Sequence, residues 1–199
     1  MYFLAAVSLL SAVIAQAAPT TTVAPSSATT TTASTATASD VNSACAVQPT
    51  GVSVRPSTDT AAAFTKYTGF HGAAVSAASP SGYLISFASA NKAVAQSDSY
   101  MTYYLLNSYD PQTCANYCDN SYGCTSFNIF FERAPTLNPA AGCPNPPSAT
   151  YVKCSLFAHT IASTQLATNA GQWRGPYVGN NVTQNFQVVL AGSNAYNKN

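Results

Sequence analysis

Charge is the scarcest property of this sequence. Seven Lys and Arg and six Asp and Glu make up 7% of the 199 residues, and the formal net charge is +1. A typical soluble domain carries about 25% charged residues. Binding to nucleic acid or to an anionic membrane surface requires a basic face or cluster, so this composition argues against both. The hydrophobic fraction of 47% argues against a wholly disordered polar chain.

Side chains used in enzyme chemistry are also few. Glu132 is the single glutamate, and the histidines are His71 and His159. A two-carboxylate glycosidase would have to draw on Glu132 and the five aspartates, at positions 40, 59, 98, 110 and 119. Glu132 could combine with Asp110 or Asp119, but Asp110 is better explained as a helix cap. The G-x-S-x-G, H-E-x-x-H and P-loop motifs are missing from the sequence. We therefore predict a non-catalytic protein without a cofactor or metal, and a glycan-acting hydrolase is the less favoured alternative.

The N-terminus has the pattern of an export signal. Residues 1–15 are apolar and uncharged, too short for a bilayer span of about 20 residues, and end at Ala15-Gln16-Ala17, an A-x-A cleavage pattern. We predict a signal peptide over residues 1–17, with a buried apolar helix as the alternative. Residues 18–44 are rich in Ser and Thr with interspersed Pro, so we expect a disordered segment. Its composition favours an O-glycosylated stalk over an unmodified spacer.

Two further features of the sequence bear on whether the protein is secreted. Asn181-Val182-Thr183 is an N-glycosylation sequon, so Asn181 is a predicted glycosylation site. Residues 194–199 are polar, so we expect neither a lipid anchor signal nor membrane insertion after signal removal. Together with the export signal, these features predict a secreted protein that is extracellular or associated with the cell wall.

The six cysteines all follow the Ser/Thr-rich segment, at positions 45, 114, 118, 124, 143 and 154. An even number of cysteines in an exported chain predicts three disulfides, although six cysteines allow 15 pairings. A metal site is disfavoured because no C-x-x-C occurs and neither histidine belongs to a ligand pair. The bridges should supplement the hydrophobic core of a single domain over residues 45–199.

Local patterns outline the elements of that domain. A short helix is expected within 52–68, capped by Asp59, and a second over 112–119, capped by Asp110 with Pro111 at its first position. Between Cys124 and Phe131, the odd-numbered residues should face the core. The predicted strands are 83–87, 100–106, 124–131, 151–157 and 182–191. This order predicts an α+β domain with a mostly antiparallel sheet and one main helix.

One run of residues resembles a known family. The pattern Tyr109-Asp110-x3-Cys114-x3-Cys118-x5-Cys124-x2-Phe127, with Cys154-Ser155-Leu156 in a later strand, resembles the PAN/apple superfamily over roughly residues 98–192. The segment 127–133, the Cys-Pro-Asn-Pro-Pro-Ser loop and Ala191-Gly192-Ser193-Asn194 are similar to a branch of secreted fungal proteins. The resemblance implies one helix stapled by disulfides onto an antiparallel sheet.

The same resemblance implies a disulfide pairing. Cys118 would pair with Cys124 and Cys114 with Cys154, which leaves Cys45 for Cys143. Residues 45–96 have no counterpart in the apple core. They are therefore an N-terminal extension that either adds strands or packs as an irregular lobe.

PAN/apple domains bind proteins or carbohydrates, so the resemblance implies recognition of a glycan or an extracellular protein. The 12 Tyr, nine Phe and one Trp support this, because exposed rings can stack on sugars. Candidate ligand-binding residues are Trp173, Arg174 and Tyr177 in a Gly/Asn-rich loop, and the adjacent Glu132 and Arg133. Trp173 could instead cover the sheet, and Glu132 with Arg133 could be a structural pair.

Two expectations remain. Tyr103 and Tyr104 are consecutive in a predicted strand, so they should point to opposite faces of the sheet, one toward the core and one toward solvent. The alternative to a recognition module is a structural cell-wall glycoprotein without a discrete ligand.

Overall fold

The structure is a computed structural model that describes residues 41–95, 99–167, 178–179, 182–183 and 186–199. All of these residues belong to one compact unit. The predicted signal peptide, and the predicted stalk as far as residue 40, lie outside the described residues.

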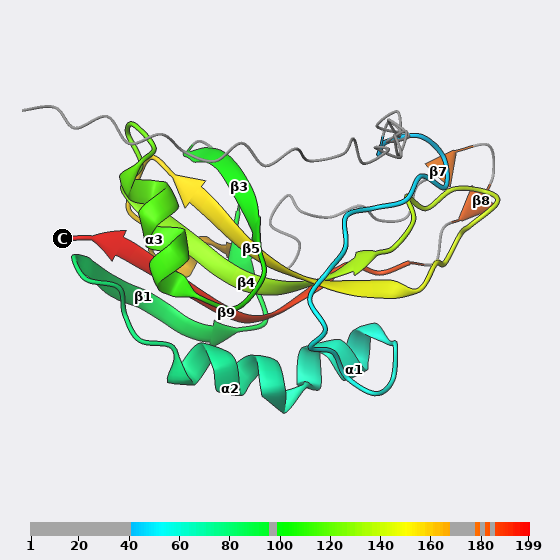
Figure 1. The fold of residues 1–199 in the computed structure, drawn as a ribbon, viewed down its shortest axis with the longest axis horizontal. Coiled ribbons are helices and arrows are strands. Elements are labelled where there is room, and N and C mark those ends of the chain that lie inside the picture. The colour runs from blue at the N-terminus through cyan, green and yellow to red at the C-terminus, as the bar shows by residue number, and fades with distance from the viewer. Residues whose placement is uncertain (1–40, 96–98, 168–177, 180–181, 184–185) are drawn as a thin grey trace, which may run out of the picture. The chain divides into compact units, whose positions relative to one another are not determined.

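A five-stranded antiparallel sheet forms the centre of the domain (Figure 1). Its strands, in spatial order, are β1 (Tyr83–Ala90), β9 (Val189–Lys198), β4 (Ser126–Pro135), β5 (Ser148–Phe157) and β3 (Tyr100–Leu106). The central strand β4 pairs along its length with both neighbours: Ile129 lies opposite Cys154 of β5 and Asn194 of β9. The predicted α+β class with a mostly antiparallel sheet is confirmed.

Three helices cover one face of the sheet, which we call the helix face. They are α1 (Ala61–Lys66), α2 (Thr68–Ser76) and α3 (Pro111–Asp119). The first two lie against β9 and β1, and α3 lies against β4. Phe64, Phe70 and Cys114 of these helices share one buried cluster with Phe131 of β4, whose ring stacks on Phe70 at 4.3 Å between centroids.

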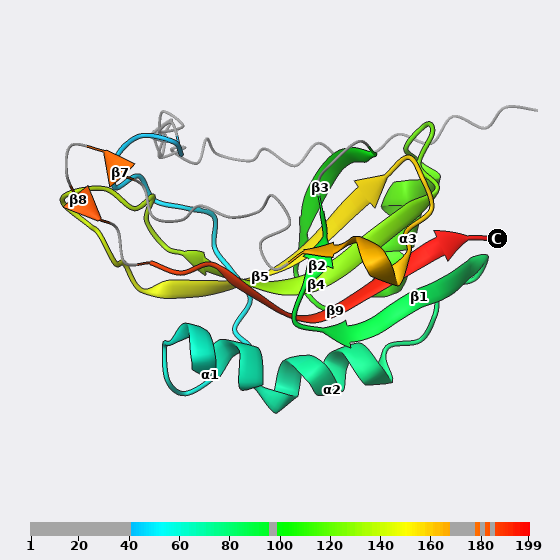
Figure 2. The ribbon, with the colours of Figure 1, turned by 180° about the vertical axis from the view of Figure 1, so that it is seen from behind.

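The opposite face, which we call the back face, is partly covered as well (Figure 2). Strand β2 (Ala93–Val94) pairs there with β6 (Leu166–Ala167), which follows the short 3-10 helix η1 (Ser163–Gln165). Strands β7 (Val178–Gly179) and β8 (Val182–Thr183) form a separate two-stranded sheet. Ala93 packs on Phe130, and Val94 packs in a cluster with Phe157. The side chains of β4 are therefore buried on both faces, whereas the sequence pattern predicted a single core face.

Burial on both faces requires that polar side chains in β4 find partners. Asn128 is fully buried on the back face. Its side-chain oxygen accepts a hydrogen bond from the Val94 amide, and its nitrogen donates to the Ser193 hydroxyl and the Asn194 carbonyl. This bonding ties β2 and β9 to the central strand, because a buried amide without partners would be costly.

The two helix caps show how local signals compete with distant partners. Asp110 accepts a hydrogen bond from the Gln112 amide and Pro111 occupies the first turn of α3, as predicted. Helix α1, in contrast, is capped by Thr60, whose hydroxyl accepts from the Ala63 amide. The prediction that Asp59 caps this helix was wrong, because the Asp59 carboxylate pairs with Arg133.

The sequence pattern missed two other elements. Helix α2 was not predicted, and it is as long as α3. The last strand was predicted over 182–191, but the structure has β8 at 182–183 and the long strand β9 over 189–198. The N-terminal extension contributes α1, α2 and the edge strand β1, so it adds a strand to the sheet.

Three disulfides hold the layers together: Cys45–Cys143, Cys114–Cys154 and Cys118–Cys124. These are the pairs that the resemblance implies. The first ties the N-terminal segment to the loop between β4 and β5, and the other two tie α3 to β5 and to the turn before β4.

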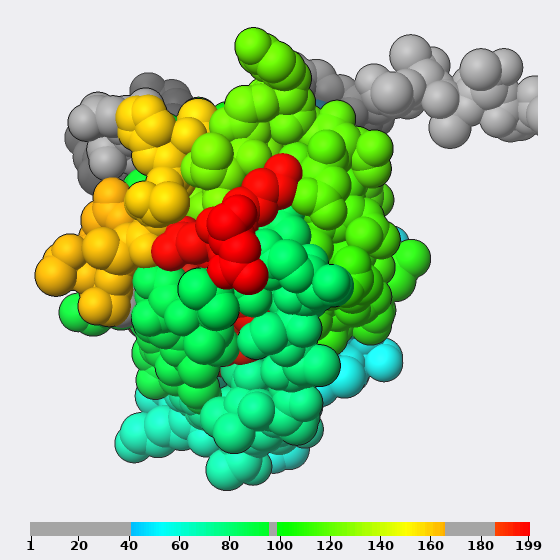
Figure 3. All heavy atoms as spheres, turned by 90° about the vertical axis from the view of Figure 1, so that its left-hand side faces the viewer, coloured from blue at the N-terminus to red at the C-terminus, as the bar shows by residue number. Residues whose placement is uncertain are grey.

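The C-terminal end of β9, red in Figure 3, lies between green segments of the chain. Its Lys198 ammonium lies 3.1 Å from the Asp119 carboxylate and donates to the Cys124 carbonyl at 3.2 Å. The Tyr83 hydroxyl donates to the same carboxylate at 2.9 Å. These contacts therefore join β1, β9 and α3.

Candidate functional site

Of the five candidate ligand-binding residues, the structure describes Glu132 and Arg133, which lie near the end of β4. Successive side chains of a strand point to opposite faces. Glu132 consequently lines a pocket on the back face, whereas Arg133 lines another on the helix face, beside Phe64. The interpretation that they pair with each other was wrong, since each has a different ionic partner.

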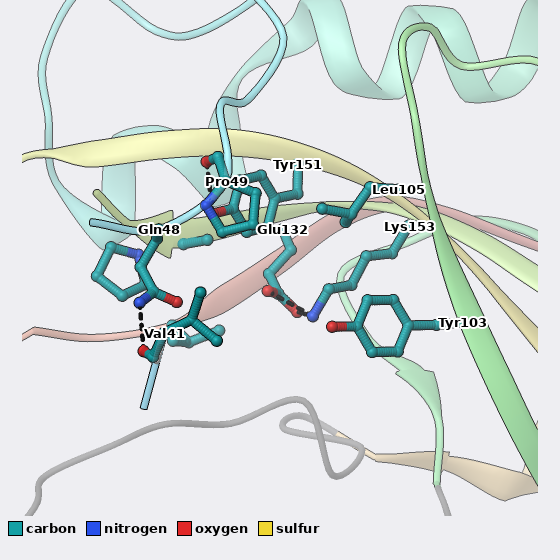
Figure 4. A pocket seen from close by; sticks show the side chains of 11 residues that line it. Val41, Gln48, Pro49, Tyr103, Leu105, Glu132, Tyr151 and Lys153 are labelled. Atoms are coloured by element: carbon teal, nitrogen blue, oxygen red, sulfur yellow. Dashed lines mark hydrogen bonds and ion pairs between the residues drawn. The ribbon is translucent and has the colours of Figure 1, made fainter. Parts of the chain in front are cut away.

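The back-face pocket is built around a buried ion pair (Figure 4). The Lys153 ammonium lies 2.8 Å from the Glu132 carboxylate, and the two side chains are 10% and 4% exposed. Lys153 comes from β5, where it lies opposite Phe130, two positions along the register from the Glu132–Tyr151 pair and on the same face of the sheet. A buried pair of this kind is held in one geometry by the strand register and presents both a donor and an acceptor at the pocket floor.

Tyr103 forms the exposed side of this pocket, which we call the Tyr103 pocket. Its side chain is 45% exposed, and the Lys153 ammonium lies 4.8 Å from its ring centroid, within the range of a cation–π contact. Tyr104 faces the helices instead and stacks on Tyr117 at 3.9 Å between centroids. The prediction that Tyr103 and Tyr104 point to opposite faces is confirmed.

Residues of the segment 41–49 form the rim of the Tyr103 pocket. The Tyr151 hydroxyl donates to the Pro49 carbonyl at 2.8 Å, and the Gln48 side chain donates to the Val41 carbonyl at 2.7 Å. The cavity inside has a volume of about 70 Å³. Since a water molecule in the liquid occupies about 30 Å³, it is large enough for about two waters and too small for a whole sugar ring.

The carboxylates proposed for a glycosidase are not brought together. Asp110 is engaged at the N-terminus of α3, where it also accepts from the Thr113 hydroxyl at 2.6 Å. Asp119 is engaged at the other end of that helix by Lys198 and Tyr83. Glu132 faces the opposite side of the sheet.

The second pocket holds Arg133 in a dense set of contacts. Its guanidinium donates to the Asp59 carboxylate at 2.7 and 3.0 Å and to the Gln187 carbonyl at 2.8 Å. It also lies 4.2 Å from the ring centroid of Phe186. Burial raises the pKa of Asp59, but hydrogen bonds from Ser148 and the bonds and charge of Arg133 lower it more, so the net pKa lies below the ordinary 3.8.

The remaining predicted site residues, Trp173, Arg174, Tyr177 and Asn181, lie outside the described residues. The sequence reasoning missed Lys153 as a site residue and did not connect Tyr103 with Glu132. One signal was present: Tyr151 and Lys153 alternate with apolar residues in a predicted strand, which places both on one face.

Within the ranges that the structure describes, no cluster of three or more His, Cys, Asp or Glu side chains is arranged to hold a metal ion. No helix in the same ranges is long and apolar enough to cross a membrane. Comparisons of the chain with models of known families, with curated proteins and with solved structures returned no match.

Proposed function

We propose that this protein is a secreted, non-catalytic recognition module that binds carbohydrate at the cell surface or wall through the Tyr103 pocket. The observation that supports this best is the position of the exposed Tyr103 ring directly beside the buried Glu132–Lys153 pair. Export is supported by the sequence of residues 1–17.

The chemistry of the pocket suits a hydroxylated ring. An aromatic face packs on the C–H face of a sugar, and Leu105, which is 37% exposed, extends this apolar platform. A carboxylate accepts hydrogen bonds from hydroxyl groups, and an ammonium donates to their oxygens. The site therefore offers one stacking surface and two polar groups of opposite character.

The size of the cavity limits how a ligand binds. A volume of about 70 Å³ admits one hydroxyl or hydroxymethyl group in place of about two waters. The ring itself remains outside, on Tyr103 and Leu105. A ligand hydroxyl that enters this cavity loses little relative to water, because it can make the same hydrogen bonds to Glu132 and Lys153 that a water molecule could make.

The test is a glycan-array and wall-polysaccharide binding screen with the exported protein, followed by titration of any ligand found. Tyr103→Ala should weaken binding about two- to twelvefold, which corresponds to about 0.5–1.5 kcal/mol, the contribution of a stacked pair of aromatic rings taken as the guide for a ring stacked on a sugar. Tyr122→Ala is the matched control, because Tyr122 is fully exposed and lines none of the described pockets. It should leave the affinity unchanged.

Other results would contradict the proposal. Equal losses from both tyrosine variants would remove the Tyr103 pocket as the binding site. Binding to no glycan would leave an extracellular protein ligand or a structural wall role. Release of new sugar ends that is abolished by Glu132→Gln would identify a hydrolase, since a binding module has no turnover to lose.

A further inference from the structure

A second region of the surface has the volume and polarity of a binding site. Two adjoining pockets of about 310 and 320 Å³ share Arg55 and Ser148 in their walls. Cavities of this size reach the range that small ligands occupy, which starts at about 300 Å³. We call the two pockets together the Arg55 groove. It runs between the N-terminal segment 47–60 and the start of β5.

Positive charges outnumber negative ones among the residues that line the Arg55 groove. Two of the three arginines in the sequence, Arg55 and Arg133, line it together with Asp59. Arg133 and Asp59 neutralise each other, and the carboxylate also accepts from the Ser148 hydroxyl at 2.6 Å and amide at 2.9 Å. Arg55 is exposed and has no hydrogen bond or ion pair to any described residue. Among the described residues of the groove, one positive charge is therefore left without an opposite partner, on Arg55.

The backbone that carries Arg55 is fixed on both sides. Three residues earlier, the Val52 amide donates to the Thr150 carbonyl at 2.8 Å. Gly51 lies so close to β5 that a Cβ atom there would overlap with the same carbonyl oxygen. Four residues later, Asp59 is bonded to Ser148. Arg55 is thus presented from a short segment anchored at each end, which lowers the entropy lost on binding a ligand.

The neutral lining favours a sugar. Hydroxyl side chains line the groove together with Arg55: Ser148 is shared by both pockets, Ser57 and Thr60 line one, and Thr50 and Thr136 line the other. A guanidinium recognises a carboxylate through two parallel hydrogen bonds, while hydroxyls can donate to or accept from sugar hydroxyls. A peptide with several acidic residues would need several unpaired cations, and the groove offers one.

We propose that the Arg55 groove binds a carboxylate-bearing oligosaccharide, with Arg55 holding a uronic acid group and the surrounding hydroxyls holding the sugar. This rests on the proposed function in that the ligand is a glycan, but it concerns other residues than the Tyr103 pocket.

The experiment is a calorimetric titration of the exported protein with oligogalacturonate and with its fully methyl-esterified form, which has the same rings without the charge. The acid form should bind more tightly, and Arg55→Gln should weaken its binding about tenfold, as expected for loss of a charge-assisted hydrogen bond. Arg55→Lys should restore part of the affinity, because an ammonium keeps the charge but not the bidentate geometry. Higher ionic strength should reduce the difference between the two forms.

Two controls make the result specific. Lys92→Gln removes an exposed positive charge in the turn between β1 and β2, outside the groove, and should leave the affinity unchanged. Tyr103→Ala should leave the advantage of the acid form over the ester intact. If that advantage is missing while a Tyr103-dependent glycan still binds, the groove assignment fails and the proposed function stands.

The remaining outcomes overturn the groove assignment. Equal affinity for acid and ester would show that the charge is not recognised. Equal losses from Arg55→Gln and Lys92→Gln would indicate attraction by net charge only. An acidic peptide that binds more tightly than oligogalacturonate, and depends on Arg55, would make the ligand a protein segment.

Discussion

Glu132 and Arg133 are neighbours in β4, yet their charged groups lie on opposite faces of the sheet and line different pockets. Glu132 pairs with Lys153 of β5 and Arg133 with Asp59 of the N-terminal extension. One dipeptide thus connects both candidate binding surfaces to the central strand. Only 7% of the residues are charged, and four of the charged side chains form the two ion pairs at this dipeptide.

The Glu132–Lys153 pair should show strong coupling in the free energy of unfolding. Lys153→Met leaves a buried carboxylate without its cation, so we expect a loss of about 3–5 kcal/mol. The double variant Glu132→Leu/Lys153→Met removes both charges and should recover most of that loss. Urea unfolding of the single and double variants measures the coupling, and additive losses would contradict it.

Acid should destabilise the protein through Asp59 and Asp119. Burial raises the pKa of Asp119, but hydrogen bonds from Lys198 and Tyr83 and the Lys198 charge lower it more, so it lies below 3.8, as does that of Asp59. A depressed folded-state pKa gives stability that is complete above the unfolded pKa and is lost as the pH falls through the folded value. We expect the free energy of unfolding to fall mainly below about pH 4.

The control for this acid effect is Asp119→Asn, examined by urea unfolding at several pH values. Since the amide cannot titrate, the variant should start less stable at neutral pH and lose less on acidification. An unchanged pH dependence in Asp119→Asn and Asp59→Asn would show that other groups carry the acid sensitivity.

Three glycines should respond differently to alanine. Gly192 has φ +56°, and a Cβ there would lie 2.5 Å from the Phe70 carbonyl, so Gly192→Ala should cost about 3 kcal/mol or more. Gly82 has φ +79° but open space, so Gly82→Ala should cost about 1–2 kcal/mol. Gly72 lies in α2 with open space, so Gly72→Ala should stabilise by about 1 kcal/mol. Thermal unfolding would rank them, and equal effects would contradict the close approach at Gly192.

Local chemistry explains which elements could be predicted from the sequence. The Asp110-Pro111 start of α3 depends on residues within one turn, so it is visible in the sequence. The role of Asp59 depends on Arg133, which is 74 residues away, so the pattern suggested a cap where the structure has an ion pair. Most of strand β9, from residue 192 onward, escaped prediction because it is buried on both faces, and buried polar residues such as Asn194 disrupt the expected alternation.

The same reasoning applies to the candidate site. Glu132 stood out because it is the single glutamate. Its partner Lys153 is set by the register of β4 and β5, and Tyr103 by the register of β5 and β3. Spacing within one strand carries no information about those registers, so the pocket could be assembled only from the structure.

Two disulfides of α3 offer a comparison in which burial is nearly constant. Cys114 and Cys154 are fully buried, as is Cys118, and Cys124 is 4% exposed. Their loops differ, however, with sequence separations of 40 and 6. If a disulfide acts mainly by restricting the unfolded chain, removing the first bridge should cost about 4 kcal/mol and removing the second about 2 kcal/mol. Urea unfolding of the paired variants Cys114→Ala/Cys154→Ala and Cys118→Ala/Cys124→Ala measures this difference. Because the packing lost is similar in the two variants, equal losses would mean that packing around α3, and not chain entropy, determines what these bridges contribute.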